Sequence, residues 1–245
     1  DQLFYPSPYI GDMGDVRTVK ALKESVKRME ELLEVKPEIV ACDMHPSYNT
    51  RAAAEEMGLP VFPVQHHYAH ILSCMAENEW TTKKKVIGVS FDGTGYGTDG
   101  TIWGGEILLA DYDSFKRWGC IEPFAQTGGD ASAKEGWRIA VSLLGKIYGK
   151  EIALSIIETL GLCESKLAKL QFTMEERGIN TVKSTSAGRL FDAVSAILGI
   201  RKASTFEGEA STSLQFAAEK WLDSQEEKIA GYEDFVESGV ITEYR

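Results

Sequence analysis

The chain has 245 residues, of which 43% are hydrophobic and 26% charged, so it can bury the core of one large domain or of two lobes. Its formal net charge of −11, with no basic cluster beyond residues 83–85, argues against a nucleic-acid partner. No apolar run approaches the roughly 20 residues that a membrane span needs. The sequence shows neither a signal peptide nor a close cysteine pair, and this pattern favours the reducing cytoplasm over a secreted or membrane-bound location.

The first third of the chain alternates between helical and strand-like patterns. Apolar residues spaced three or four apart predict a helix over 15–34, and the short apolar run 39–42 predicts a buried strand. A helix over 49–56, a strand over 61–64 and a further helix that begins near His66 follow. This alternation indicates parallel α/β architecture.

The pattern then changes twice. Strands are predicted over 86–91, 101–110 and 116–121, with a glycine-rich turn over 92–100. Three consecutive strands indicate an antiparallel meander. From about residue 131 onward helical patterns dominate, over 131–146, 150–160, 163–176, 185–198 and 208–228.

Three of the four histidines lie between residues 65 and 70. On a helix, His66 and His70 are one turn apart and point the same way, so the two imidazoles can share a metal ion, whereas His67 points elsewhere. Cys74 follows one turn later on the same face, where we expect a buried structural thiol. Two ligands do not complete a metal site, so capping or core histidines remain the alternative.

Asp92 and the glycines that follow it form the second candidate site. A carboxylate at a strand end can hold a metal, and glycines let backbone N–H groups approach phosphate oxygens. The spacing matches neither the P-loop nor the dinucleotide-binding fingerprint. A hairpin turn without a ligand is the competing interpretation.

Two helix starts offer weaker signals. Gly128-Gly129-Asp130 precedes one helical stretch and residues 186–192 open another. Helix N-termini favour anions, and a carboxylate such as Asp192 can accept hydrogen bonds from ribose hydroxyls. Ordinary capping by Asp130 and an ion-paired Asp192 are the alternatives.

Taken in order, six segments resemble the HypF carbamoyltransferase family: DMHPSY (43–48), VQHHYAH (64–70), FDGTGYGTDGTIWGGE (91–106), GGD (128–130), SAGRLFDA (186–193) and FEGEA (206–210). The matching region of that family is similar to the universal family that makes threonylcarbamoyl-adenosine in tRNA. The resemblance implies an α/β, actin/Hsp70-like fold of two ribonuclease-H-like lobes. Residues 1–82 would be part of the first lobe, with the histidine helix, and residues 83–245 part of the second. Because the chain begins with Asp1 and lacks a downstream paired-glycine motif, we expect an internal portion of the family's C-terminal domain, truncated at both ends.

The resemblance also assigns roles to residues. It implies that His66, His70 and Asp92 are ligands of a divalent metal, and this donor set suits zinc and iron alike. It implies a nucleotide site whose residues are Gly93, Thr94, Gly95, Tyr96 and Gly97 at the phosphates, Gly129 lining the site, and Gly188 and Asp192 near the sugar.

The function implied is carbamoyl transfer in the maturation of nickel–iron hydrogenases. In this family ATP and carbamoyl phosphate yield carbamoyl-adenylate in a separate upstream domain, and the actin-like domain passes the carbamoyl group to the C-terminal cysteine of a HypE-like acceptor protein. The resemblance assigns the metal and the nucleotide site but no catalytic residue, and we expect this chain alone to be incomplete as an enzyme.

Other functions remain open. The related tRNA threonylcarbamoyltransferases have a Glu inside the histidine motif where this chain has Tyr68-Ala69, and the acidic balance disfavours tRNA. Antibiotic O-carbamoyltransferases share a similar histidine motif but fit the 91–106 segment less well. A metallopeptidase lacks support because the motif has no HExxH glutamate. A non-catalytic module that docks the acceptor and holds a structural metal is an alternative of a different class.

Overall fold

The structure is a computed structural model that describes residues 3–224. The chain divides into two compact units, residues 1–121 and residues 122–245. The predicted lobe boundary at residue 82 concerns the family's lobes and stays a prediction. Within the described residues no helix is long and apolar enough to cross a membrane.

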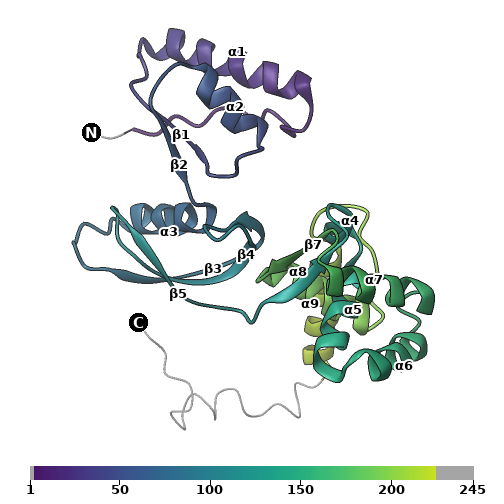
Figure 1. The fold of residues 1–245 in the computed structure, drawn as a ribbon. Helices are drawn as coiled ribbons and strands as arrows, with labels where there is room; N and C mark the ends of the chain where they lie inside the picture. The colour runs from purple at the N-terminus through teal and green to yellow at the C-terminus, as the bar shows by residue number, and fades with distance from the viewer. Residues whose placement is uncertain (1–2, 225–245) are drawn as a thin grey trace. The chain divides into compact units, whose positions relative to one another are not determined.

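The first unit contains three helices and five strands among its described residues (Figure 1). They are α1 (Val16–Leu33), β1 (Val40–Asp43), α2 (Asn49–Glu56), β2 (Val61–Val64), α3 (His66–Glu77), β3 (Val86–Tyr96), β4 (Ile102–Ala110) and β5 (Phe115–Cys120). All eight correspond to predicted elements, although β3 extends further than expected.

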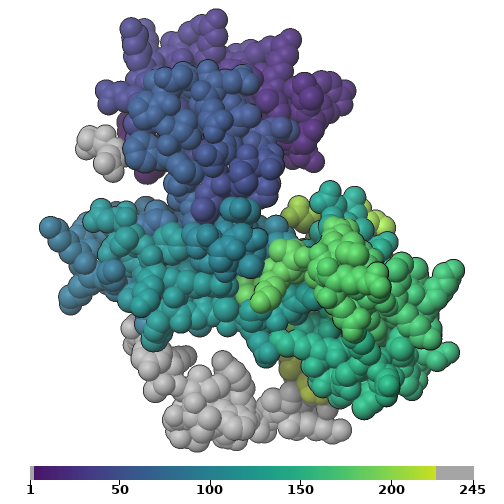
Figure 2. All heavy atoms as spheres, viewed as in Figure 1, coloured from purple at the N-terminus to yellow at the C-terminus, as the bar shows by residue number. Residues whose placement is uncertain are grey.

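The beginning of this unit has the predicted parallel α/β arrangement. Asp15 caps α1 by accepting the Arg17 N–H at 2.8 Å, and the helix ends at Glu34 in the left-handed conformation. β1 and β2 pair in parallel, from Val40 opposite Val61 to the end of both strands. The side chains of α1 and α2 lie against each other (Figure 2). β1 ends at Asp43, and β2 ends two residues before α3 begins at His66. Because Asp43 pairs with Val64, the sheet places Asp43 beside the start of α3.

The strands β3, β4 and β5 form the predicted antiparallel meander, and α3 lies along one face of β3 and β4 (Figure 1). Tyr68, Ile71 and Met75 of α3 are buried there together with Leu108 and Ala110 of β4. Burial of these apolar side chains fixes which face of α3 points inward.

The second unit is mainly helical. Its described elements are β6 (Phe124–Thr127), α4 (Ala131–Lys134), α5 (Gly136–Tyr148), α6 (Lys150–Leu160), α7 (Ser165–Arg177), β7 (Thr181–Ser184), α8 (Ala187–Ile197) and α9 (Glu209–Asp223). The core centres on α5, where Ile139 and Val141 are fully buried against side chains of α6, α7 and α8.

Sequence patterns missed two features of this unit, the strand pair and a break in one helix. The strands β6 and β7 pair antiparallel, with Phe124 opposite Ser184, but each has four residues, which is too short for a period-two pattern to stand out. The helix expected over 131–146 is two helices, because the chain leaves helical geometry at Glu135. The end of the helix expected over 208–228 lies outside the described residues.

Candidate metal centre

The histidine motif forms the first turns of α3. Gln65 is the N-cap, and its side-chain oxygen accepts the Tyr68 N–H at 2.9 Å. Since Tyr68 and Ile71 face the meander, His66 and His70 lie one turn apart on a more open face, with side chains 37% and 58% exposed. Helical spacing therefore presents two imidazoles side by side.

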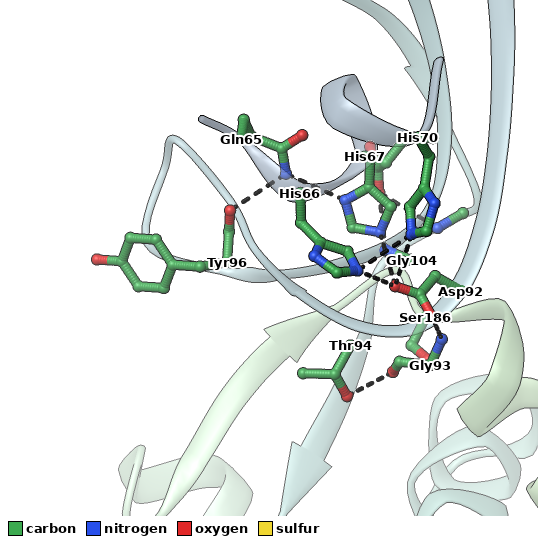
Figure 3. A network of polar contacts seen from close by, with 12 residues as sticks. Gln65, His66, His67, His70, Asp92, Gly93, Thr94, Tyr96, Gly104 and Ser186 are labelled. Carbon is green, nitrogen blue, oxygen red and sulfur yellow. Dashed lines mark hydrogen bonds and ion pairs between the residues drawn. The ribbon is translucent and has the colours of Figure 1, made fainter. Parts of the chain in front are cut away.

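The carboxylate comes from an irregularity in β3. Phe91 pairs with Gly105 and Gly95 pairs with Trp103, so the three residues from Asp92 to Thr94 lie opposite Gly104 alone. Such a bulge bends the strand and redirects its side chains. Asp92 accepts the Gly93 N–H at 2.6 Å through Oδ1, which leaves Oδ2 facing the histidines (Figure 3).

His66, His70 and Asp92 converge on one point (Figure 3). The His66 Nε2 lies 2.9 Å from the Asp92 Oδ2 and 3.2 Å from the His70 Nε2, and the His70 Nε2 lies 4.0 Å from the same Asp92 oxygen. Zinc ligands at about 2.0–2.1 Å in a tetrahedron are about 3.3 Å apart, so the three separations lie within about 0.7 Å of that value. The donor atoms fit a divalent ion, while metal binding itself stays a prediction.

His66 and Asp92 shift each other's pKa. The pKa of His66 is raised, mainly because its imidazolium form hydrogen-bonds the Asp92 carboxylate, with Asp43 contributing as well. The pKa of Asp92 is lowered, first by the same hydrogen bond and then by the Gly93 N–H, against the opposing effect of burial. A proton shared here lies where a cation would bind, so metal uptake has to displace it.

His67 is closer to the centre than expected. Its side chain is fully buried, its Nδ1 lies 3.0 Å from the Gln65 Nε2, and its Nε2 lies 3.7 Å from the Asp92 Oδ2. His67 points into the interior and not toward the open face of His66 and His70, as predicted, but its Nε2 still comes close to Asp92. The pKa of His67 is lowered, chiefly by burial. His67 is not a member of the three-residue group whose donor atoms converge.

Two other residues near the motif differ in outcome. His45 is likewise not part of the converging group, and its ring stacks on Tyr48 with centroids 4.0 Å apart. Cys74 is exposed, so the expectation of a buried thiol is wrong: the inward face of α3 carries Ile71 and Met75, and Cys74 lies beside it.

Sequence reasoning gave no role to Asp43. It ends β1, and its Oδ2 lies 3.2 Å from the His66 Nδ1. The only sequence signal was its position at the head of the 43–48 motif, which carried the family resemblance without indicating a contact.

The predicted glycine turn is placed differently. Gly93, Thr94, Gly95 and Tyr96 belong to β3, and the turn is confined to 97–101, where the Gly97 N–H donates to the Thr101 carbonyl at 2.9 Å. Thr94 donates its hydroxyl to the Gly93 carbonyl, and the Tyr96 carbonyl accepts from the Gln65 side chain.

Packing explains two of these glycines. A Cβ on Gly95 would lie 2.3 Å from the His67 ring, and a Cβ on Gly97 would lie 2.3 Å from the Trp103 indole nitrogen. Gly95 and Gly97 are thus required for close approach within this unit. That their backbone meets a nucleotide stays a prediction.

The remaining nucleotide candidates lie in the second unit. Gly129 has a positive φ of 57° and faces the Asn180 side chain, and Gly188 lies in the first turn of α8. Asp192 is buried and pairs with Arg189 at 2.8 Å. Burial raises the pKa of Asp192, and Arg189 opposes that effect. The carboxylate expected at a sugar is engaged by a neighbour on its own helix, as the ion-paired alternative has it.

Comparison with known proteins identifies two consecutive matches to family models. Residues 1–77 match the HypF Kae1-like domain, and residues 88–241 match the second subdomain of the carbamoyltransferase Kae1-like domain.

Among curated relatives, carbamoyltransferase HypF2 of Cupriavidus necator is 38% identical over 222 residues, which is 89% of this chain and 26% of that protein. The probable carbamoyltransferase HypF of Methanocaldococcus jannaschii is 36% identical over 89% of this chain and 29% of its own length. A HypF homolog from Cupriavidus necator is 35% identical, and there the match covers 55% of the relative. The chain spans about a quarter of the length of the first two relatives.

Solved structures agree with these matches. Full-length HypF in its phosphate- and nucleotide-bound form superposes with a TM-score of 0.76 at 37% identity, over 84% of this chain and 26% of that one. HypF of T. kodakarensis superposes with a TM-score of 0.79 at 34% identity, over 88% of this chain and 30% of that one. The predicted α/β, actin/Hsp70-like fold class is confirmed by these superpositions and by the Kae1-like family models.

Proposed function

The chain belongs to the HypF carbamoyltransferase family, and from that premise we propose that it forms the metal-binding, group-transferring part of such an enzyme. The observation that carries the proposal is the convergence of two imidazole nitrogens and one carboxylate oxygen of His66, His70 and Asp92, all within 4.8 Å of one another. The substrate would be carbamoyl-adenylate, made from ATP and carbamoyl phosphate in another part of the enzyme. The acceptor would be the C-terminal cysteine of a HypE-like protein in the cytoplasm.

The reaction is an acyl-type transfer. The acceptor sulfur attacks the carbamoyl carbon and a C–S bond forms. The bond from that carbon to the phosphate oxygen breaks, AMP leaves with the electron pair, and the thiol proton passes to solvent. Negative charge develops on the carbonyl oxygen during the attack, so a site that stabilises that charge accelerates the step.

The residues of this chain would hold and orient the reacting groups. His66, His70 and Asp92 would bind a zinc or iron ion, which when bound supplies Lewis-acid polarisation of the carbonyl. The segment 93–97, with Gly129, Gly188 and Asp192, would contact the nucleotide, although Asp192 must then leave or share its pairing with Arg189.

Carbamoyl transfer by the enzyme restored to full length, with this chain in place, tests the proposal. This enzyme is mixed with the acceptor, ATP and carbamoyl phosphate, and mass spectrometry of the acceptor's C-terminal peptide detects the carbamoyl group. We expect the wild-type chain to transfer the group and the His66→Ala and Asp92→Asn variants to fail.

The docking-module alternative predicts a different pattern. If those variants support transfer as well as the wild type while the acceptor still binds, the centre is structural and the transfer chemistry lies elsewhere. Omitting the adenylate-forming domain is the matched control, because the proposal assigns adenylate formation to that domain, and the reaction should then give no product.

A further inference from the structure

Asp43 lies directly behind His66 as seen from the candidate ion position. Its Oδ1 accepts the His45 N–H at 2.8 Å, which fixes the carboxylate, and its Oδ2 lies 3.2 Å from the His66 Nδ1. The Asp43 side chain is 19% exposed, so water competes weakly for this contact. A carboxylate only accepts hydrogen bonds, and therefore the His66 Nδ1 is the donor and its Nε2 is the atom turned toward His70 and Asp92.

A second group of polar side chains approaches Asp92 from the helix side. The Gln65 Oε1 accepts the Tyr68 N–H, so the amide nitrogen of Gln65 faces the Tyr96 carbonyl at 3.2 Å and the His67 Nδ1 at 3.0 Å. With two acceptors beside one NH₂ group, the His67 Nδ1 accepts and the ring proton lies on Nε2. That Nε2 is buried, forms no hydrogen bond within the described part of the chain, and lies 3.7 Å from the Asp92 Oδ2.

Asp43 contacts the His66 ligand, whereas His67, held by Gln65, lies beside the Asp92 ligand. Metal-bound histidines almost always donate their second N–H to a carboxylate or carbonyl, and ligating carboxylates are themselves held by hydrogen bonds. A buried N–H costs free energy when it has no acceptor, so a small approach of Asp92 toward His67 is favoured once the carboxylate ligates an ion. Gly95 makes room for this arrangement, because any side chain there would meet the His67 ring.

We propose that Asp43 and His67 are positioning residues of the metal centre, Asp43 orienting the His66 ligand and His67 orienting the Asp92 ligand. The proposal rests on the metal-binding part of the proposed function. It adds an outer layer to the three ligands, and neither residue touches the ion or the substrate.

Metal affinity of the whole 245-residue chain tests the role of Asp43, measured by competition with a chromogenic chelator for Zn²⁺. Loss of an outer-layer partner typically weakens binding by about 10- to 100-fold. We expect the loss of Zn²⁺ affinity in Asp43→Ala to lie in that range. Asp43→Asn keeps an acceptor oxygen but no charge, so we expect it to lose less affinity. Asp113→Asn removes an exposed carboxylate from the same unit and should bind as the wild type does.

His67 is tested by a matched pair. His67→Met fills the space without an N–H, whereas His67→Gln retains one, so we expect the glutamine variant to recover part of the affinity lost in the methionine variant. Absorption of bound Co²⁺ reports ligand geometry, and a spectrum altered in Asp43→Ala and His67→Met, with unchanged thermal unfolding of the metal-free protein, supports orientation over a general structural role.

The outcomes separate the two proposals. If His66→Ala abolishes metal binding but Asp43→Ala and His67→Met bind as tightly as the wild type with unaltered Co²⁺ spectra, the positioning roles are overturned and the metal centre stands. If wild-type protein and His66→Ala take up Zn²⁺ equally, the metal centre itself is overturned, and the positioning proposal falls with it.

Discussion

The two units use carboxylates in opposite ways: Asp92 is partly buried, with its side chain 29% exposed, and Asp192 is buried. In the first unit, Asp92 receives His66 from a different element, and its pKa is lowered by that partner. In the second, Asp192 pairs with Arg189 three residues earlier on the same helix, yet burial still raises its pKa. Asp92 faces histidines that a different element contributes, whereas Asp192 already has its charge partner on its own helix. Polar groups contributed by several elements are therefore the better guide to a binding centre than a buried charge alone.

Removal of a ligand should have the largest effect on metal binding by the first unit. His70→Ala leaves two donor atoms, so we expect metal binding to fall by more than the roughly 10- to 100-fold caused by loss of an outer partner. His45→Ala, a histidine outside the converging group, is the matched control and should bind normally. Isothermal titration with Zn²⁺ measures both. Equal loss in the two variants would mean that the motif as a whole, and not the geometry of three atoms, holds the ion.

Removing the carboxylate of the second unit should affect stability instead. Asp192→Ala leaves the buried Arg189 guanidinium without its carboxylate, and we expect the free energy of unfolding to fall by about 3 kcal/mol, with Zn²⁺ affinity unchanged. Urea unfolding measures the change. The double variant Arg189→Met/Asp192→Leu should recover most of it, because it removes both charges. A stability unaffected by Asp192→Ala would show that this pair is not the satisfied counterpart of the first-unit cluster.

A steric substitution links packing to the centre. Gly95→Ala places a methyl group against the His67 ring, and overpacking of this kind costs about 1–3 kcal/mol of stability. Gly119→Ala in β5 is the control, since its Cβ meets nothing closer than 3.7 Å. Thermal unfolding of the metal-free proteins measures the difference. If the Gly95→Ala variant is as stable as the Gly119→Ala control, the His67 ring can shift to make room. A ring that shifts so easily cannot orient Asp92.

A change of pH should have the smallest effect on Zn²⁺ affinity. Because the raised pKa of His66 reflects a proton held by Asp92, protons compete with the ion, so Zn²⁺ affinity should be level above that pKa and fall as pH drops through it. Affinity measured across a pH series, with His45→Ala in parallel, checks the direction. Binding that strengthened on acidification would contradict the assignment of His66 as a ligand.

Local patterns predicted the elements that local forces determine. The spacing of His66 and His70, the helix expected over 15–34 and the α/β order follow from interactions within a few residues. The bulge at Asp92 and the approach of Asp43 to His66 could not be predicted, since they depend on strand register and on segments 23 and more residues apart. The four-residue strands of the second unit were missed for the related reason that their pairing, and not their composition, defines them.

The bulge in β3 bears on how the residue at position 92 can change in evolution. Pairing is regular up to Phe91 opposite Gly105 and resumes at Gly95 opposite Trp103, so the residues between them form a bulge within the continuous strand β3. The residues of a bulge lie outside the regular ladder, so no strand pair depends on the side chain at position 92. A lineage could therefore lose or exchange the acidic residue at position 92 while keeping the sheet, and an engineer could graft other donors at the same point.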